Sequence, residues 1–101
     1  MTIEGTAIVM MTEMPGAGTA FAEVMRQAGI LDALQAARGF RGHWSGATGS
    51  GYRVFELWDS REDCQAFADG NFAPNLPPGT ELPPMEFFEL NFEVKPAPRH
   101  I

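Results

Sequence analysis

The spacing of apolar positions changes several times along the chain, and each stretch of constant spacing predicts one element. Residues 2–12 are rich in apolar and β-branched side chains, which predicts a strand with a buried face. Residues 19–38 instead show helical spacing, with Thr19 as the expected N-cap. The apolar stripe of this segment comprises Phe21, Val24, Met25, Ala28, Leu31, Leu34 and Ala37. Gly29 lies inside the stripe and weakens a helix, so we expect either one long helix or a broken one.

The second half of the chain repeats this order of strand and helix signals. Two short aromatic segments, residues 40–45 and 52–59, are joined by a glycine-rich stretch and predict a β-hairpin. Ser60 is the expected N-cap of a second helix. The inward-facing residues of that helix are expected to be Cys64, Phe67 and Ala68. Prolines make residues 73–84 an extended loop, and residues 85–94 regain strand character.

The resulting order, βαββαβ, predicts a ferredoxin-like α+β fold with a four-stranded antiparallel sheet and two helices on one face. We expect residues 1–95 to form this single domain and residues 96–101 to be a C-terminal tail. No further helix is predicted to cover the second sheet face, so two copies are expected to pair there as a homodimer. A chain of 101 residues has a small core, and we therefore expect a sizeable pocket to need the partner subunit.

The predicted hairpin divides its side chains between two faces. A turn centred between Thr48 and Gly49 places Arg41 opposite Glu56 and His43 opposite Val54. One face then carries Phe40, Gly42, Trp44, Arg53, Phe55 and Leu57, whose apolar bulk suits packing under the helices. The other carries Arg41, His43, Ser45, Tyr52, Val54, Glu56 and Trp58, a mixture of polar and aromatic groups that suits a cavity.

Charge and composition exclude several functions. The net charge of −6 and the pI of about 4.7 argue against binding to nucleic acid or to an anionic membrane surface. The longest apolar run, residues 7–11, is too short to cross a bilayer, and the first basic residue is Arg26, so we expect a cytoplasmic protein. One cysteine and two distant histidines offer too few ligands for a metal centre. We therefore expect no metal or other cofactor, and interpret Cys64 as a core residue.

Two stretches of sequence resemble a known family. Residues 39–44 (GFRGHW) and 51–63 (GYRVFELWDSRED), followed by Phe67 and Pro74, resemble small actinobacterial proteins of the dimeric α+β barrel superfamily. Antibiotic biosynthesis monooxygenase-like members share a strand that ends in Trp-x-Ser before the second helix. The resemblance covers about residues 5–94 by element order, and its specific part is residues 39–67. The family includes cofactor-free monooxygenases, polyketide cyclases, lactone isomerases and haem-degrading enzymes.

The resemblance also bears on single residues. Relatives often carry a histidine at the position of His43, facing the barrel cavity, which agrees with the face assigned above. Haem-degrading members combine a first-strand asparagine, the tryptophan before the second helix and a histidine on that helix. Only the tryptophan, Trp58, is present here, so the resemblance argues against haem degradation.

Two functions remain open. The first is a cofactor-independent enzyme that acts on an aromatic or polyketide-type molecule by proton transfer or oxygenation. His43 would then be the general acid or base, and Arg41 would hold a developing enolate or phenolate. The substrate would be bound by Tyr52, Val54, Glu56 and Trp58, with the two aromatic residues stacking on its ring. The second is a non-catalytic dimeric protein that binds an apolar ligand. Its Arg41 would pair with Glu56, and His43, Tyr52 and Trp58 would serve packing and hydrogen bonding.

Overall fold

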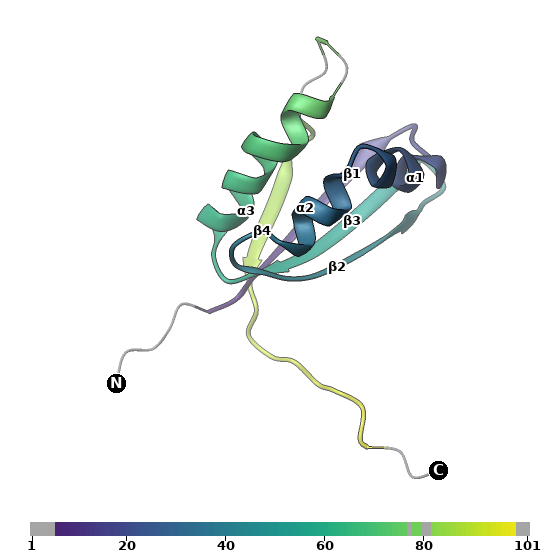
Figure 1. Cartoon of the computed structure of the whole chain (residues 1–101). Helices are drawn as coiled ribbons and strands as arrows, with labels where there is room; N and C mark the ends of the chain where they lie inside the picture. The colour runs from purple at the N-terminus through teal and green to yellow at the C-terminus, as the bar shows by residue number, and fades with distance from the viewer. Residues whose placement is uncertain (1–5, 77, 80–81, 99–101) are drawn as a thin grey trace.

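A computed structural model describes residues 6–76, 78–79 and 82–98, which form one four-stranded antiparallel sheet with helices on one side (Figure 1). The strands are β1 (Ile8–Pro15), β2 (Phe40–Ala47), β3 (Gly51–Trp58) and β4 (Met85–Glu89), in the spatial order β2-β3-β1-β4. This order and the antiparallel pairing of all neighbours confirm the predicted ferredoxin-like α+β fold.

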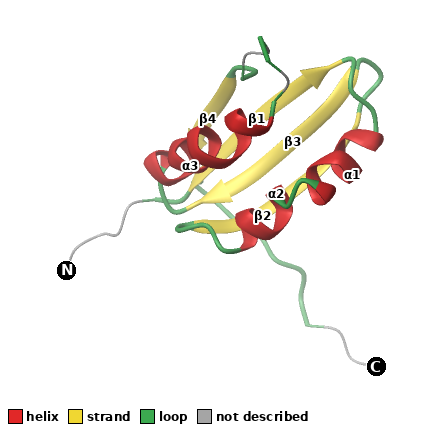
Figure 2. Cartoon of the chain, turned by 45° about the horizontal axis from the view of Figure 1, so that its top comes forward, coloured by secondary structure: helices red, strands yellow, loops and turns green. Residues whose placement is uncertain are grey.

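The helices all lie on the same face of the sheet (Figure 2). They are α1 (Ala20–Gln27), α2 (Ile30–Gln35) and α3 (Arg61–Phe67), and α3 continues into a π-helical turn, η1 (Ala68–Phe72), and a 3-10 turn, η2 (Ala73–Asn75). No other element described by the structure covers the opposite face, which we call the open face. The helix-bearing side is called the covered face.

The break predicted at Gly29 separates α1 from α2. Gly29 has φ of 78°, a left-handed conformation that favours glycine, and it lets the chain change direction between the two short helices. Phe21 and Met25 of α1 pack against the core as expected, whereas Val24 is 61% exposed, so the apolar stripe is narrower than predicted. Thr19 precedes α1, but its side chain makes no capping hydrogen bond.

Helix α3 begins as the sequence predicts. The Ser60 hydroxyl oxygen accepts a hydrogen bond of 3.1 Å from the backbone N–H of Asp63, which stabilises the first turn. Cys64, Phe67 and Ala68 are all buried. The π-helical turn then carries the chain onward to Phe72, which packs against the same core. The predicted loop over residues 73–84 therefore starts with a short 3-10 turn.

Trp58 is the centre of the packing between sheet and helices. It is completely buried, and its ring lies 5.5 Å from that of Phe40 and 5.8 Å from that of Phe67, measured between centroids. These three rings join the ends of β2, β3 and α3. Burial of a side chain of this size stabilises the fold by several kcal/mol, ~3–5 by the cost of its removal.

The first and last strands of the chain differ from their predicted bounds. β1 extends to Pro15, which lies opposite Gly51 at the start of β3. Within this extension the Arg53 guanidinium donates to the Glu13 carboxylate at 2.6 and 2.9 Å. Hydrogen bonds from Arg53 and Ser50 lower the pKa of Glu13. β4 ends at Glu89, which lies opposite Ile8, the first residue of β1. One further backbone hydrogen bond of 2.8 Å runs from the Leu90 N–H to the Ala7 carbonyl. Of the predicted first strand, residues 2–5 lie outside the described residues.

The hairpin register differs from the predicted one by two residues. The turn is centred one position later, and the Thr48 N–H donates to the Gly51 carbonyl at 2.7 Å. His43 therefore lies opposite Glu56, and a bulge between Phe40 and Gly42 shifts the start of β2 so that Phe40 lies opposite Trp58. The predicted Arg41–Glu56 pair is wrong, because the later turn places His43 opposite Glu56 and Arg41 lies in the bulge.

Each hairpin face keeps most of its predicted residues. The face predicted to pack under the helices is, however, the open face, and the other face lies under the helices. The row with His43, Tyr52 and Glu56 lies under the helices, where its polar groups satisfy one another by hydrogen bonds. The open face instead carries Trp44 and Phe55, which are 60% and 41% exposed. The prediction that apolar bulk marks the covered face is therefore wrong for every member of that set except Phe40.

Candidate active site

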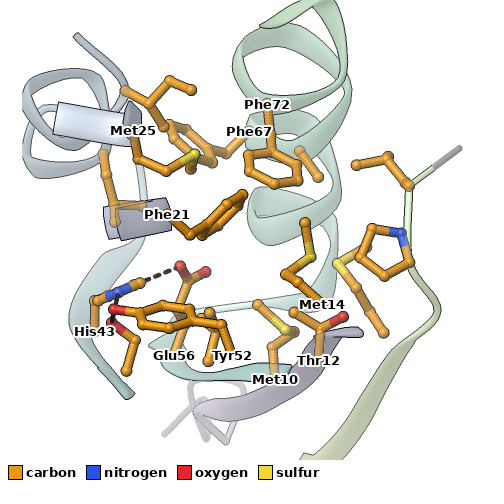
Figure 3. Close-up of a pocket in the computed structure, with 18 of the residues that line it drawn as sticks. Met10, Thr12, Met14, Phe21, Met25, His43, Tyr52, Glu56, Phe67 and Phe72 are labelled. Atoms are coloured by element: carbon orange, nitrogen blue, oxygen red, sulfur yellow. Dashed lines mark hydrogen bonds and ion pairs between the residues drawn. The ribbon is translucent and has the colours of Figure 1, made fainter. Parts of the chain in front are cut away.

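A cavity of about 180 Å³ lies between the covered face and the helices (Figure 3). Its floor comes from β1, β2 and β3, its opposite wall from α1, α2, α3 and η1, and one side from the segment leading into β4. The Thr12 hydroxyl donates to the Pro84 carbonyl at 2.8 Å and ties that segment to the floor. All of these walls belong to one subunit, so the expectation that a partner is needed to form the pocket is wrong.

Polar side chains form a hydrogen-bonded row across the floor. His43 Nδ1 lies 2.8 Å from Glu56 Oε2, and Trp58 Nε1 donates to the other carboxylate oxygen, Oε1, at 2.9 Å. On the other side of the imidazole, Nε2 lies 3.0 Å from Ser45 Oγ, which lies 2.7 Å from the Tyr52 hydroxyl. The row thus runs Trp58–Glu56–His43–Ser45–Tyr52 between two adjacent strands.

The Glu56 carboxylate determines which group donates and which accepts in each hydrogen bond of this row. An ionised carboxylate only accepts hydrogen bonds, so His43 Nδ1 carries a hydrogen and donates it to Glu56. In the neutral imidazole, Nε2 then accepts from the Ser45 hydroxyl, and Ser45 Oγ accepts from the Tyr52 hydroxyl. Glu56 is buried, 7% exposed, and both of its carboxylate oxygens have a donor. The row can therefore take up a proton at His43 and place the resulting positive charge beside a carboxylate.

The remaining walls of the cavity are apolar and rich in aromatic rings and methionine. Phe21 lies across the cavity from the floor, with its ring 5.6 Å from that of Tyr52 and 6.3 Å from that of Phe72. Methionines at positions 10, 14, 25 and 85 line the space around them. Among the described lining residues none is lysine or arginine. Such walls suit a flat, uncharged, largely apolar molecule.

Cys64 also lines the cavity, but as a neutral thiol. Burial raises its pKa to about 12, and the neighbouring Glu56 carboxylate adds to this effect. A thiol with this pKa is a poor nucleophile at neutral pH. Its position therefore agrees with the interpretation of Cys64 as a core residue.

The structure brings four of the six predicted site residues together. His43, Tyr52, Val54 and Glu56 all line the cavity. Trp58 lies behind the floor, fully buried, where it holds Glu56 and has no surface on which a substrate ring could stack. Arg41 is displaced by the bulge, and its guanidinium lies 3.8 Å from Asp59 Oδ1, outside the set of lining residues.

Several lining residues were missed at the sequence level. Ser45 was placed on the correct face but given no role, although its position two residues after His43 on one strand puts both on the same side. Phe21 was placed on the apolar stripe of the first helical segment, and Phe72 was given no role. Their contact depends on the fold bringing α1 and η1 together, which no local pattern reveals.

Two kinds of feature are missing from the described residues. No group of three or more His, Cys, Asp or Glu side chains there could hold a metal ion. Within the same residues, no helix is long and apolar enough to cross a bilayer.

Comparison with known proteins finds relatives only among solved structures; no family model and no curated protein matches the chain. A protein of unknown function from Nitrosomonas europaea, NE2512, is 23% identical, with a TM-score of 0.63 over 94% of this chain and 99% of its own. The heme-degrading protein Rv3592 from Mycobacterium tuberculosis is 25% identical, with a TM-score of 0.61 over 90% of this chain and 98% of its own.

A third relative carries a ligand. It is a monooxygenase from the gene ActVA-Orf6 of Streptomyces coelicolor, in complex with nanaomycin D, and it is 15% identical with a TM-score of 0.60 over 93% of this chain and 95% of its own. At these identities the likeness concerns the fold. The chain has the fold of the antibiotic biosynthesis monooxygenase-like branch of the dimeric α+β barrel superfamily.

Proposed function

We propose that this protein binds a small aromatic or polyketide-type molecule in the cavity and acts on it without a cofactor, by proton transfer or oxygenation that begins with proton uptake at His43. The observation that carries the proposal is a histidine-centred hydrogen-bonded row on one wall of an otherwise apolar cavity. Histidine changes its charge near neutral pH and is suited to this task.

The cavity walls favour a neutral ligand. A carboxylate or phosphate entering it would meet Glu56 and no lysine or arginine among the described lining residues. The Phe21 ring contacts both Tyr52 and Phe72, so an aromatic ligand would pack beside these rings. Relatives with this fold support ligand binding of this kind, since one is complexed with nanaomycin D and another is a heme-degrading protein.

Haem itself does not fit the residues present. His43 is the only histidine in the part of the chain that the structure describes, and both of its ring nitrogens already have hydrogen-bond partners. The described lining residues include no cation to pair with the two propionates of haem. We therefore do not include haem among the ligands of this cavity.

We further propose that two copies pair through their open faces. Trp44, Phe55 and Phe88 are 60%, 41% and 56% exposed there, alongside Val9 and Leu57. Gly42 makes room for the Trp44 ring, which lies against it so closely that a Cβ at position 42 would stand 2.6 Å from the indole. A sheet face of this composition is stabilised when another sheet packs on it.

The proposed activity is tested with His43→Gln. Hydroxylated naphthalenes and anthracenes are incubated with the wild-type protein in air, and loss of substrate and gain of oxygen are followed by absorbance and mass spectrometry. Removing a general acid or base costs about 10²-fold or more in turnover. We expect this loss of turnover in His43→Gln, together with a ligand affinity that changes less than about threefold. Arg38→Gln, which alters a side chain that is 95% exposed, is the matched control. Unchanged turnover in His43→Gln would remove His43 from the mechanism.

A second candidate is a non-catalytic ligand-binding protein. It is favoured by one observation, that both nitrogens of His43 are hydrogen-bonded, as in a histidine with a structural role. In that case the same compounds bind to the wild-type protein and to His43→Gln, and neither protein alters them.

A further inference from the structure

The hydrogen-bonded row ends at the Tyr52 hydroxyl, and Tyr52 lines the cavity. We propose that Tyr52 is the group that exchanges a proton with a hydroxyl of the bound molecule, and that Ser45 passes this proton to His43. This inference rests on the function proposed above. It assigns Tyr52 as a catalytic residue, and Ser45 and Glu56 as positioning residues.

Geometry limits how a ligand can reach His43. Its Nδ1 is held by Glu56 at 2.8 Å and its Nε2 by Ser45 at 3.0 Å, so neither nitrogen has a free lone pair or hydrogen directed at the cavity. The Tyr52 oxygen is different. A phenolic hydroxyl has one hydrogen and two lone pairs, and its 2.7 Å contact with Ser45 uses the hydrogen. The Tyr52 oxygen can therefore accept a further hydrogen bond from a ligand hydroxyl.

The proton transfer balances along the row. The O–H bond of the ligand breaks, and its proton goes to the Tyr52 oxygen. Tyr52 gives its own proton to Ser45 Oγ, and Ser45 gives its proton to His43 Nε2. The products are a ligand oxyanion and an imidazolium paired with the Glu56 carboxylate, while Tyr52 and Ser45 end as neutral hydroxyls. No oxidant or reductant is consumed, and the reverse sequence returns the proton.

Each distance in the row suits this transfer. Three successive contacts of 2.7, 3.0 and 2.8 Å lie within hydrogen-bond range. Trp58 fixes the far end by its 2.9 Å bond to Glu56 and is itself immobilised in the core. Ser45 is the one exposed member of the row, and it lines the cavity. Its hydroxyl is therefore the link that a substitution can remove with least effect on the fold.

The first test uses naphthol, a neutral aromatic hydroxyl compound whose absorbance changes when it loses its proton. We expect naphthol bound to the wild-type protein to ionise at a lower pH than naphthol bound to Ser45→Ala or to Tyr52→Phe. The affinity for neutral naphthol should change less than about threefold in Ser45→Ala, because the walls are intact. Ser45→Thr keeps the hydroxyl and should restore the wild-type midpoint. Ser50→Ala, a serine of the same hairpin whose hydroxyl bonds Glu13 outside the cavity, is the matched control.

The second test needs neither ligand nor turnover. Nitrogen NMR of the His43 ring distinguishes the Nδ1–H tautomer from the Nε2–H tautomer, and the variant His43→Gln assigns its signals. We expect the Nδ1–H tautomer in the neutral ring, with the Nε2 signal displaced in Ser45→Ala and unaffected in Ser50→Ala. Finding the Nε2–H tautomer in the wild-type protein overturns the proposed order of donors.

The outcomes separate this inference from the proposed function. If naphthol or another aromatic hydroxyl compound is bound and altered, but Ser45→Ala leaves the ionisation midpoint unchanged, the function stands and the relay is wrong. If the expected tautomer is found while no aromatic compound binds the wild-type protein, the hydrogen-bond order is supported and the proposed function fails.

Discussion

The two faces of the sheet reverse the usual distribution of side chains. The covered face has a buried carboxylate, an imidazole and three hydroxyls on its floor, whereas the open face exposes tryptophan and phenylalanine to solvent. Polar groups are rarely placed under helices unless they are fully hydrogen-bonded, and here each has a partner. Large apolar residues are rarely left together on an open sheet unless something packs on them.

The comparison teaches that each face is arranged for a different kind of partner. On the covered face, polar groups meet one another along β2 and β3, and the apolar walls opposite leave room for a small molecule. On the open face, the pairs formed by Trp44 with Phe55 and by Val9 with Phe88 make a surface suited to a second sheet. The three predictions below test this division.

The largest effect on stability is expected where Trp58 packs between the covered face and the helices. Trp58→Ala removes a fully buried ring that contacts Phe40 and Phe67 and leaves Glu56 without one donor. We expect the free energy of unfolding to fall by about 3–5 kcal/mol, measured by urea denaturation. Val24→Ala, at a side chain that is 61% exposed, should change it by less than about 0.5 kcal/mol. Equal losses in the two variants would contradict the position given to Trp58.

A smaller effect, confined to association, is expected on the open face. Trp44→Asp places a charge among apolar residues that are proposed to pack against the partner subunit. We expect the dissociation constant of the dimer to rise about thirtyfold, which corresponds to about 2 kcal/mol, measured by sedimentation over a range of protein concentrations. His43→Gln, one residue away on the covered face, should leave association unchanged. A wild-type protein that is monomeric at every concentration would remove the proposed role of this face.

The smallest effect is a pH dependence from Cys64. Its pKa is raised from 9.0 to about 12 by burial, so the unfolded chain loses the thiol proton first. The stability that Cys64 contributes is therefore complete below about pH 9 and declines as the pH rises, by at most tenfold per pH unit in the unfolding constant. We expect the difference in stability between the wild-type protein and Cys64→Ala to be constant below about pH 9 and to shrink as the pH is raised from about 9 to 10. A difference that does not vary with pH would place Cys64 in contact with water.

Element order and helix starts could be predicted from the sequence because their signals are local. Ser60 precedes its helix and caps it, and Gly29 breaks the apolar stripe where the chain turns. The alternation along each strand also grouped His43, Ser45, Tyr52 and Glu56 correctly on one face. Strand alternation determines which side these four side chains share, so the polar part of the site could be predicted from the sequence.

What could not be predicted depends on contacts between distant segments. The choice of covered face was decided by hydrogen bonds that let Glu56 and His43 be buried, and apolarity alone pointed to the other side. A turn placed one residue too early gave His43 the wrong partner. The aromatic wall of Phe21 and Phe72 joins α1 to η1, segments about fifty residues apart whose meeting is set by the fold.

The bulge between Phe40 and Gly42 has a consequence for how this strand tolerates change in length. With the extra residue, Phe40 and His43 point to the same side although they are three positions apart. Deleting Arg41 would place Phe40 and His43 two positions apart, and simple alternation would keep both side chains on the covered face. A one-residue deletion elsewhere in the strand would instead turn the residues on one side of it to the opposite face. The bulged residue can therefore be lost without exchanging the two surfaces of the sheet.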